Sequence, residues 1–431
     1  MEQVAKSGFR RSNRREPLAF AFFGLILFMV VYFARPEDWI PGLSAVPLAK
    51  IAGILILLAL AFSSSQIHWH MPQEVIFLSL LVAQLWLAAV FSPVWRGGAV
   101  NVMLDFSKVV PLFIVIYAAV RSMKRLRWIL FVQAASVAAI ALVSILNRHA
   151  SGGRLQGILI YGISGNSNDL ALVIDISLPL CLTLALTTRS YWAKIAWIVA
   201  MLAMIYAVAL TASRAGAIAL TVAGLACLWQ LGVKGRRLYL ILLVPVAVIA
   251  IWLSSGKALQ QRFEQTEIDP ARNQHSTEAS ASTEQRKELL LKSLKITADH
   301  PIFGVGPGNF EIVSGVWHVT HNSYTQISAE GGIPSFLLYL FIFWSAIANL
   351  RKTSRYRKSG EGRLFSMALQ ASLAAYLVGS FFGSLAYQLF PYYLVAYSSA
   401  LRLIVERQLV VPSAPSKSDP APAAVEVTVW Q

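Results

Sequence analysis

Long apolar runs separated by short polar segments dominate the chain. A helix needs about 20 apolar residues to cross the hydrocarbon core of a bilayer. Runs close to this length predict twelve spans, near residues 18–34, 45–62, 75–92, 101–120, 128–146, 169–187, 195–211, 215–232, 238–254, 332–350, 365–386 and 388–404. The pattern therefore predicts an all-α polytopic membrane protein with about 12 transmembrane helices. Asp105 and Lys108 interrupt the fourth run, and Pro391 interrupts the last.

The remaining segments divide the chain around these spans. We expect the following arrangement: a cytoplasmic segment (1–17), spans one to nine (18–254), one large outer loop (255–331), spans ten to twelve (332–404) and a cytoplasmic tail (405–431). The end of the tail is rich in Pro, Ala and Ser, a composition that cannot bury enough apolar surface to fold. It is therefore predicted to be disordered.

The large loop changes character along its length. Residues 266–285 are polar and are predicted to be mobile. Ser282 and Gln285 have the spacing of a helix capping box. After them, apolar residues recur at helical intervals up to residue 298, which predicts a short amphipathic helix ending at His300. The next stretch, Gly-Val-Gly-Pro-Gly-Asn-Phe at residues 304–310, is too rich in Gly and Pro to be regular helix.

Composition and charge support a membrane protein and orient it. The chain is 56% hydrophobic and 13% charged, whereas a soluble domain carries roughly 25% charged residues. Its net charge of +16 comes from short basic clusters between apolar runs, an arrangement that does not favour nucleic-acid binding. With the N-terminus inside, most of these clusters fall on the cytoplasmic side, as the positive-inside rule expects. Both termini are then cytoplasmic, and the large loop lies on the opposite, outer side of the membrane.

Two arginines are candidates for an anion site. Arg214 lies in Thr-Ala-Ser-Arg-Ala-Gly at residues 211–216, which is almost the whole link between spans seven and eight. A single arginine there is also compatible with snorkelling to the interface. Its small neighbours would let a phosphate approach closely, and a guanidinium binds phosphate oxygens in bidentate fashion. Arg286 could be a solvated charge or the second arm of a diphosphate clamp.

Polar residues at the outer ends of two other spans complete the candidate site. His321, in His-Asn-Ser-Tyr just before span ten, suits general-base chemistry near neutral pH, although His300 and His318 lie nearby. Asn322 and Tyr324 flank it as candidate substrate contacts. Asn168, in Gly-Asn-Ser-Asn-Asp at residues 165–169, is a further candidate, although residues of this type often only cap a helix.

Other polar residues within the spans receive no functional assignment. Asp105 and Lys108 are one helical turn apart and are predicted to form a structural pair within the bundle. Asp175 lies in span six without an assigned role. No His, Cys, Asp or Glu spacing indicates a metal site. The two halves of the chain also lack the matched broken helices typical of transporters.

Taken in order, these motifs resemble the O-antigen ligase superfamily of polytopic bacterial membrane glycosyltransferases. The resemblance rests on residues 165–169, 213–216 and 304–310, on Asp-His-Pro at 299–301, and on His-Asn-Ser-Tyr at 321–324 with Glu-Gly-Gly at 330–332. Arg286 completes the set. The resemblance covers roughly residues 160–340, and the first 150 residues match only in their pattern of spans.

The resemblance implies a GT-C-like fold and an inverting, metal-independent enzyme of the bacterial inner membrane. Its donor would be a polysaccharide on undecaprenyl diphosphate, and its acceptor the lipid A–core oligosaccharide at the periplasmic face. The family's two functional arginines correspond to Arg214 and Arg286, and its loop histidine corresponds to His321. Because the donor is already activated, no cofactor is implied; membrane lipids are the other expected partners, and nucleic acid is not one.

Three alternatives stay open at this point. The same superfamily contains repeat-unit polymerases and protein O-oligosaccharyltransferases, which differ in their acceptor. A transporter of lipid-linked sugar or of a small anion is the alternative from another class. A transporter would place polar groups along a path through the midplane, whereas here they gather at the outer ends of spans.

Overall fold

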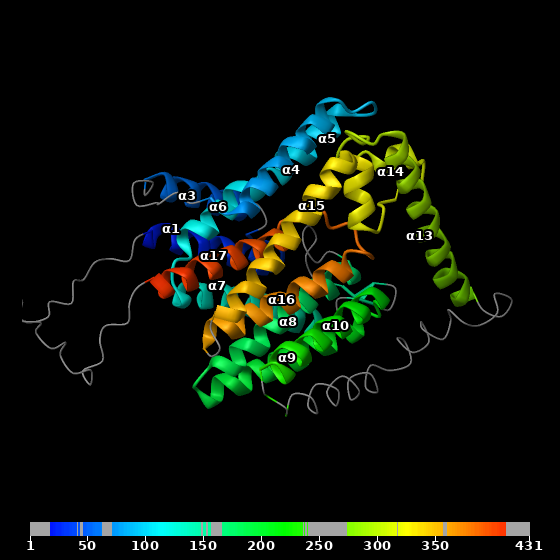
Figure 1. Ribbon diagram of the computed structural model, residues 1–431. Helices are drawn as coiled ribbons and strands as arrows, with labels where there is room; N and C mark the ends of the chain where they lie inside the picture. The colour runs from blue at the N-terminus through cyan, green and yellow to red at the C-terminus, as the bar shows by residue number, and fades with distance from the viewer. Residues whose placement is uncertain are drawn as a thin grey trace, which may run out of the picture.

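The protein is a bundle of long apolar helices, seen here in a computed structural model (Figure 1). The structure describes residues 18–40, 42, 43, 46–62, 71–147, 150, 151, 154–156, 166–235, 237, 239, 274–316, 318–356 and 360–410. In the first half the helices are α1 (Ala19–Ala34), α2 (Pro36–Trp39), α3 (Leu48–Phe62), α4 (Gln73–Val90), α5 (Arg96–Phe106), α6 (Val109–Ala119) and α7 (Met123–Leu146).

A two-stranded antiparallel hairpin, β1 (Ala150–Ser151) and β2 (Arg154–Leu155), separates α7 from the second half. The second half contains α8 (Ser167–Thr187), α9 (Tyr191–Leu210), α10 (Arg214–Cys227) with the π-helix η2 (Leu228–Val233), α13 (Gln274–Asp299), α14 (Phe310–Ser314), α15 (Ser323–Tyr356), α16 (Glu361–Gly379) and α17 (Phe390–Val410). The predicted ninth span, 238–254, and the tail from 411 lie outside the described residues.

Seven of the described helical segments are long and apolar enough to cross a membrane, and they correspond to predicted spans three to eight and ten. The first two predicted spans are the shorter apolar helices α1 and α3. Predicted spans eleven and twelve are the helices α16 and α17. The chain is therefore an all-α, multi-pass membrane protein.

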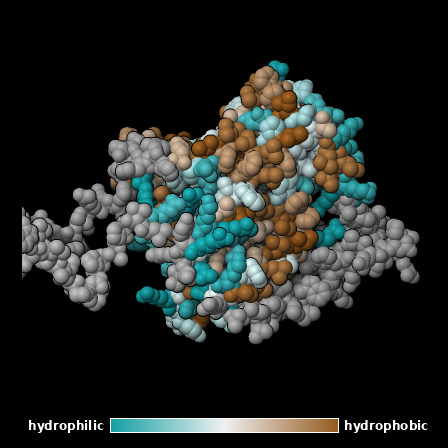
Figure 2. Space-filling view, in the orientation of Figure 1, coloured by the Kyte–Doolittle hydropathy of each residue, from teal (hydrophilic) through white to brown (hydrophobic). Residues whose placement is uncertain are grey.

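Helix α8 forms the centre of the bundle. Most of its length is buried, and it packs against α7, α9, α10 and α16, between which it lies in Figure 1. Elsewhere the bundle presents large apolar side chains outward, such as Phe20, Phe23 and Trp192, which are 77%, 77% and 78% exposed. Figure 2 shows brown, hydrophobic patches on the face of the molecule that it presents. Such a surface is suited to lipid rather than to water.

Polar caps set the helix starts that matter for the site. Asn166 caps α8, and Ser213 caps α10, each through its side-chain oxygen. Ser122 and Ser190 cap α7 and α9 at the other end of the bundle in the same way. Each cap accepts a hydrogen bond from one or two of the backbone N–H groups that a helix start leaves without partners. These short polar residues thus place the bends between long apolar helices.

Two predicted elements differ from the observed ones. The fourth span is two helices, because α5 ends at Phe106 and α6 begins at Val109. Asp105 and Lys108 at this break form the predicted ion pair, but both side chains are exposed and line a cavity of about 720 Å³ rather than lying within the bundle. The loop helix is not short: α13 begins at Gln274, so Ser282 lies inside the helix and is not its cap.

Candidate active site

Arg214 is the first residue of α10 and lies at a tight turn between two membrane helices. Ser213 accepts a hydrogen bond from the N–H of Gly216 at 3.0 Å, and Ala212 has a left-handed backbone with φ of 46°. This turn leaves only three residues between α9 and α10. The N-terminus of a helix carries a partial positive charge, and the guanidinium of Arg214 adds a full one. The position suits an anion.

Asn168 supports this turn from the start of α8. Its side-chain oxygen accepts hydrogen bonds from Ser213 Oγ at 2.7 Å and from Arg154 Nη2 at 3.1 Å. Arg154 also donates through Nε to the carbonyl of Thr211 at 2.9 Å. The three contacts tie the hairpin, α8 and the residues before Arg214 together. In this structure the oxygen of Asn168 is therefore engaged in positioning the turn that carries Arg214.

Gly216 brings the same turn close against α8. A Cβ atom added at Gly216 would lie 2.5 Å from Cβ of Ala171, far inside van der Waals contact. Only glycine allows α10 to approach α8 this closely. The small residues of the motif thus fix the depth at which Arg214 begins its helix.

Arg286 lies on α13 and faces the same region as Arg214. Its side chain is half-buried, and burial lowers its pKa below the usual value. The charge of Arg214 lowers the pKa of Arg286 further. Charges affect each other in this way over distances on the order of 10 Å. The structure therefore brings the two arginines into one electropositive site, although they are far apart in the sequence.

His321 joins this site from the loop before α15. Its backbone is left-handed, with φ of 53°, which is uncommon for a residue other than glycine. The backbone N–H of His321 donates to Ser384 Oγ at 2.9 Å, which holds it in place. Burial lowers the pKa of its imidazole, and the charges of Arg286 and then His318 lower it further. Each of these effects favours the neutral imidazole, which is the form that can accept a proton.

Asn322 and Tyr324 have scaffold contacts next to His321. Asn322 Oδ1 accepts hydrogen bonds from the N–H groups of Tyr324 at 2.9 Å and Thr325 at 3.2 Å, so it caps α15. The hydroxyl of Tyr324 donates to the carbonyl of Leu377 at 2.7 Å, and its ring packs on Phe381. Both residues therefore hold α15 against the end of α16.

The stretch from 301 to 310 repairs a break in α15. Gly332 is non-helical inside α15 and Pro334 has no N–H, so carbonyls just before the break lose their helical partners. Val305 and Gly306 donate instead to the carbonyls of Ala329 and Glu330, both at 2.9 Å. These bonds form only because Gly304 and its neighbours adopt positive φ angles. The motif is thus built into the N-terminal part of α15.

Further contacts extend the repair to α4 and α13. Asn309 donates to Ser92 Oγ at 2.9 Å, and Ser92 donates to the carbonyl of Val305 at 2.7 Å. Leu289 on α13 belongs to a small buried apolar cluster with Val305, Phe310 and others. Because α13 also carries Arg286, this packing makes the position of Arg286 depend on residues 301–310.

The comparison with protein families addresses the same region. The family described as O-antigen ligase matches residues 176–340. Over that region the chain is similar to the O-antigen ligase family. The expected resemblance is confirmed, and the matched region contains Arg214, Arg286 and His321. A search of curated proteins finds no match.

Several residues that hold the candidate site in place lie outside the family match. Arg154, Asn168 and Ser92 precede it, and Ser384 follows it. The sequence pattern indicated Asn168 but neither Arg154, Ser92 nor Ser384 as part of the site. For Ser384 a signal existed, because Ser-Phe-Phe-Gly-Ser at residues 380–384 interrupts an apolar run. Within the part of the chain that the structure describes, no three His, Cys, Asp or Glu residues are grouped as metal ligands would be.

Proposed function

We propose that the chain is a GT-C-type membrane glycosyltransferase that joins an undecaprenyl-diphosphate-linked polysaccharide to lipid A–core oligosaccharide at the periplasmic face. The observation that carries the proposal is that Arg214, Arg286 and His321 lie close enough at one end of the bundle for their charges to affect one another. The superfamily assignment supports ligase-like or polymerase-like chemistry on a glycan. The identity of the acceptor and the cellular location go beyond the family match and belong to the proposal.

The arginines would act on the leaving group. As the bond between the anomeric carbon and the diphosphate breaks, negative charge builds on the departing lipid diphosphate. Arg214 and Arg286 would bind its oxygens and stabilise that charge in the transition state. The charge of Arg214 lowers the pKa of Arg286, so the two guanidinium groups repel each other. This repulsion would be relieved when an anion binds between them.

His321 would act on the acceptor. The acceptor hydroxyl attacks the anomeric carbon, the new glycosidic bond forms as the diphosphate leaves, and the hydroxyl proton passes to the imidazole. A single displacement of this kind inverts the anomeric configuration. Binding of the donor diphosphate would also cancel part of the positive charge that lowers the pKa of His321. The histidine would therefore be a stronger base in the donor complex than in the free enzyme.

Asn168, Asn322 and Tyr324 would contribute mainly through position. Their hydrogen bonds hold the Arg214 turn and the His321 loop. A direct contact of each with substrate stays a prediction of the sequence. The apolar bundle would accommodate the polyprenyl chain of the donor.

A deletion strain complemented with wild-type or variant chain tests the acceptor. Loss of long-chain lipopolysaccharide with retention of lipid-linked polymer would support the ligase. Loss of polymer length would instead identify a repeat-unit polymerase, and loss of a glycoprotein would identify a protein O-oligosaccharyltransferase.

A reconstituted assay separates enzyme from transporter. Purified protein, lipid-linked glycan and lipid A–core should suffice for transfer. If no glycan is transferred but the lipid-linked substrate crosses the vesicle membrane, the enzymatic proposal is wrong. The transporter alternative has less support, because the candidate residues gather at one end of the bundle.

A further inference from the structure

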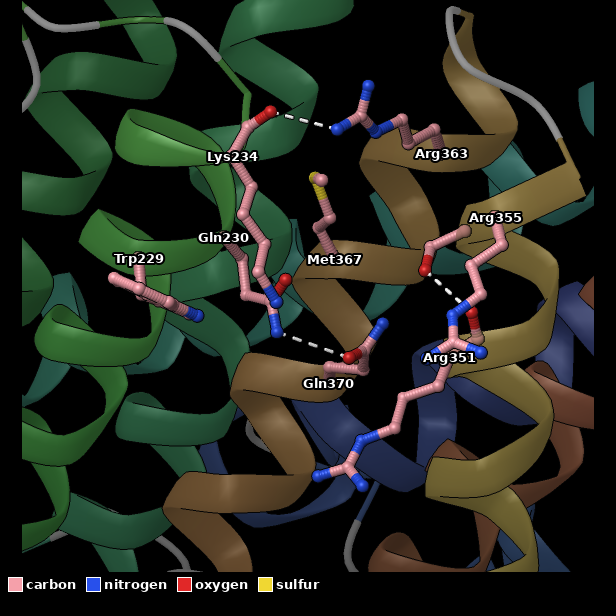
Figure 3. A pocket seen from close by; sticks show the side chains of 9 residues that line it. Trp229, Gln230, Lys234, Arg351, Arg355, Arg363, Met367 and Gln370 are labelled. Atoms are coloured by element: carbon pink, nitrogen blue, oxygen red, sulfur yellow. Dashed lines mark hydrogen bonds between the residues drawn. The ribbon is translucent and has the colours of Figure 1, made fainter.

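The bundle contains a second strongly charged site, at the end opposite Arg214 and His321. A cavity of about 700 Å³ lies between η2, the end of α15 and the start of α16 (Figure 3). Its lining includes the cations Lys234, Arg351, Arg355 and Arg363. None of the residues that line this cavity carries a carboxylate. The charge bias of the sequence predicts this end to be cytoplasmic.

The cations converge on the cavity from three elements. Arg351 and Arg355 are four residues apart on α15, so they share one helix face, where like charges repel. Among the described residues, no carboxylate lies within ion-pair distance of Lys234, Arg351 or Arg355. Figure 3 shows the two arginines on α15 across the cavity from Lys234. The positive-inside rule accounts for charges at this end of the bundle, but not for their convergence on one hollow.

The wall opposite α15 is held in a defined shape. Arg363 donates through Nη2 to the carbonyl of Lys234 at 2.8 Å, which ties the start of α16 to the end of η2. The ammonium of Lys234 lies 5.5 Å from the centre of the Trp229 ring, a cation–π contact. Residues 228–233 form a π-helix, a feature frequent at functional sites. Specific contacts within the fold therefore maintain the shape of the cavity.

The deeper end of the cavity is polar where the surrounding bundle is apolar. Gln230 donates to Gln370 at 3.2 Å across the gap between η2 and α16. Amides within a membrane bundle are costly unless they are hydrogen-bonded, and this pair places further donors and acceptors beside the cations. Cations at the entrance with amides behind them match an anion that has several oxygen atoms.

We propose that this cavity binds a phosphate-bearing anion, and that the source of the phosphate is the headgroup of an anionic membrane phospholipid. Guanidinium groups bind phosphate oxygens through paired hydrogen bonds. Basic pockets between transmembrane helices on the cytoplasmic side suit lipid headgroups. The neighbouring surface of α10 and η2 exposes Leu225, Trp229 and Val233 at 61%, 56% and 45%, a suitable surface for acyl chains.

Titration of the purified, delipidated full-length protein tests the site. Dioctanoyl-phosphatidylglycerol is the anionic probe, and dioctanoylglycerol is the same lipid without the phosphoglycerol headgroup. The double variant Arg351→Gln with Arg355→Gln should bind the phospholipid at least about tenfold more weakly, since each lost guanidinium removes a charge-assisted hydrogen bond. The control pair Arg189→Gln with Lys194→Gln removes the same charge from the same end of the bundle, and should bind like wild type.

Two further measurements complete the design. Arg355→Gln alone changes an exposed side chain, so its weaker binding can be read even if the double variant unfolds. Inorganic phosphate and pyrophosphate, titrated in parallel, identify the source. If they bind as tightly as the lipid, the cavity binds phosphate but its ligand is a soluble anion. If only the lipid binds, the lipid headgroup is the ligand. Equal weakening in the pocket and control variants, or equal binding of dioctanoylglycerol, would overturn the proposal.

Discussion

Gly216→Ala should displace the helix that begins with Arg214. The added methyl group would lie 2.5 Å from Cβ of Ala171, whereas two carbon atoms pack best at about 3.5–4.0 Å. Helices α8 and α10 must therefore move apart locally by roughly 1 Å. Overpacking of this kind destabilises by about 1–3 kcal/mol. A misplacement of about 1 Å in a catalytic group can lower the rate by on the order of 100-fold.

The compensating change Ala171→Gly removes the atom that the new methyl group meets. By itself it should destabilise α8 by about 1 kcal/mol, because glycine is a weak helix former. Combined with Gly216→Ala, it should restore part of the stability and most of the transfer rate. Wild type, the two single variants and the double variant form a double-mutant cycle, measured by thermal unfolding in detergent and by the reconstituted transfer assay. Additive effects of the two changes would refute the close α8–α10 contact as the reason for glycine at 216.

The other predictions concern the remaining parts of the site. Arg214→Lys should lower transfer by about 100-fold or more despite its retained charge, because an ammonium cannot reproduce the guanidinium fork; near-normal transfer would remove the clamp. His321→Ala should insert and fold but lose about 100- to 10,000-fold in rate; a retained rate would direct attention to His318 or Glu330. Because a protonated imidazole cannot accept a proton, the rate of wild-type transfer should fall as the pH is lowered. The fall in kcat should occur at higher pH than the fall in kcat/KM, since bound diphosphate offsets the charge of Arg286 that lowers the pKa of His321. If both parameters fall at the same pH, that effect is contradicted. Asn168→Ala should lower stability by about 1–3 kcal/mol together with the rate, while Asn168→Asp, which keeps an acceptor for Ser213 and Arg154, should lose less; an unchanged unfolding temperature in the alanine variant would show that Asn168 does not position the turn.

The sequence predicted the membrane helices well where a single physical rule decides them. Length and apolarity were sufficient for α7, α8 and α9, whose starts carry Ser or Asn caps that can be recognised locally. The turn around Arg214 was also predictable, because a short polar link between two apolar runs leaves few possible geometries. The candidate arginines and histidine come from such links and from the ordered set of motifs.

The errors fall where distant parts of the chain decide the structure. The spacing of Ser282 and Gln285 is typical of a helix start, yet α13 continues through it. The break in α15 at Gly332 is stable because residues 301–306 supply its missing hydrogen bonds, which no local pattern reveals. The backbone of His321 is held by Ser384, more than sixty residues later, so its left-handed conformation could not be inferred from neighbours.

The repaired break in α15 has a consequence for the order of assembly. The carbonyls of Ala329 and Glu330 receive their hydrogen bonds from Val305 and Gly306, which precede the helix in the chain. A membrane interior offers no water to substitute for those donors. The N-terminal segment of α15 can therefore reach its final structure only after the preceding loop lies on the same side of the bilayer as that segment. The loop that carries Arg286 would thus act as a checkpoint in assembly: a chain whose loop is on the wrong side of the membrane cannot complete α15.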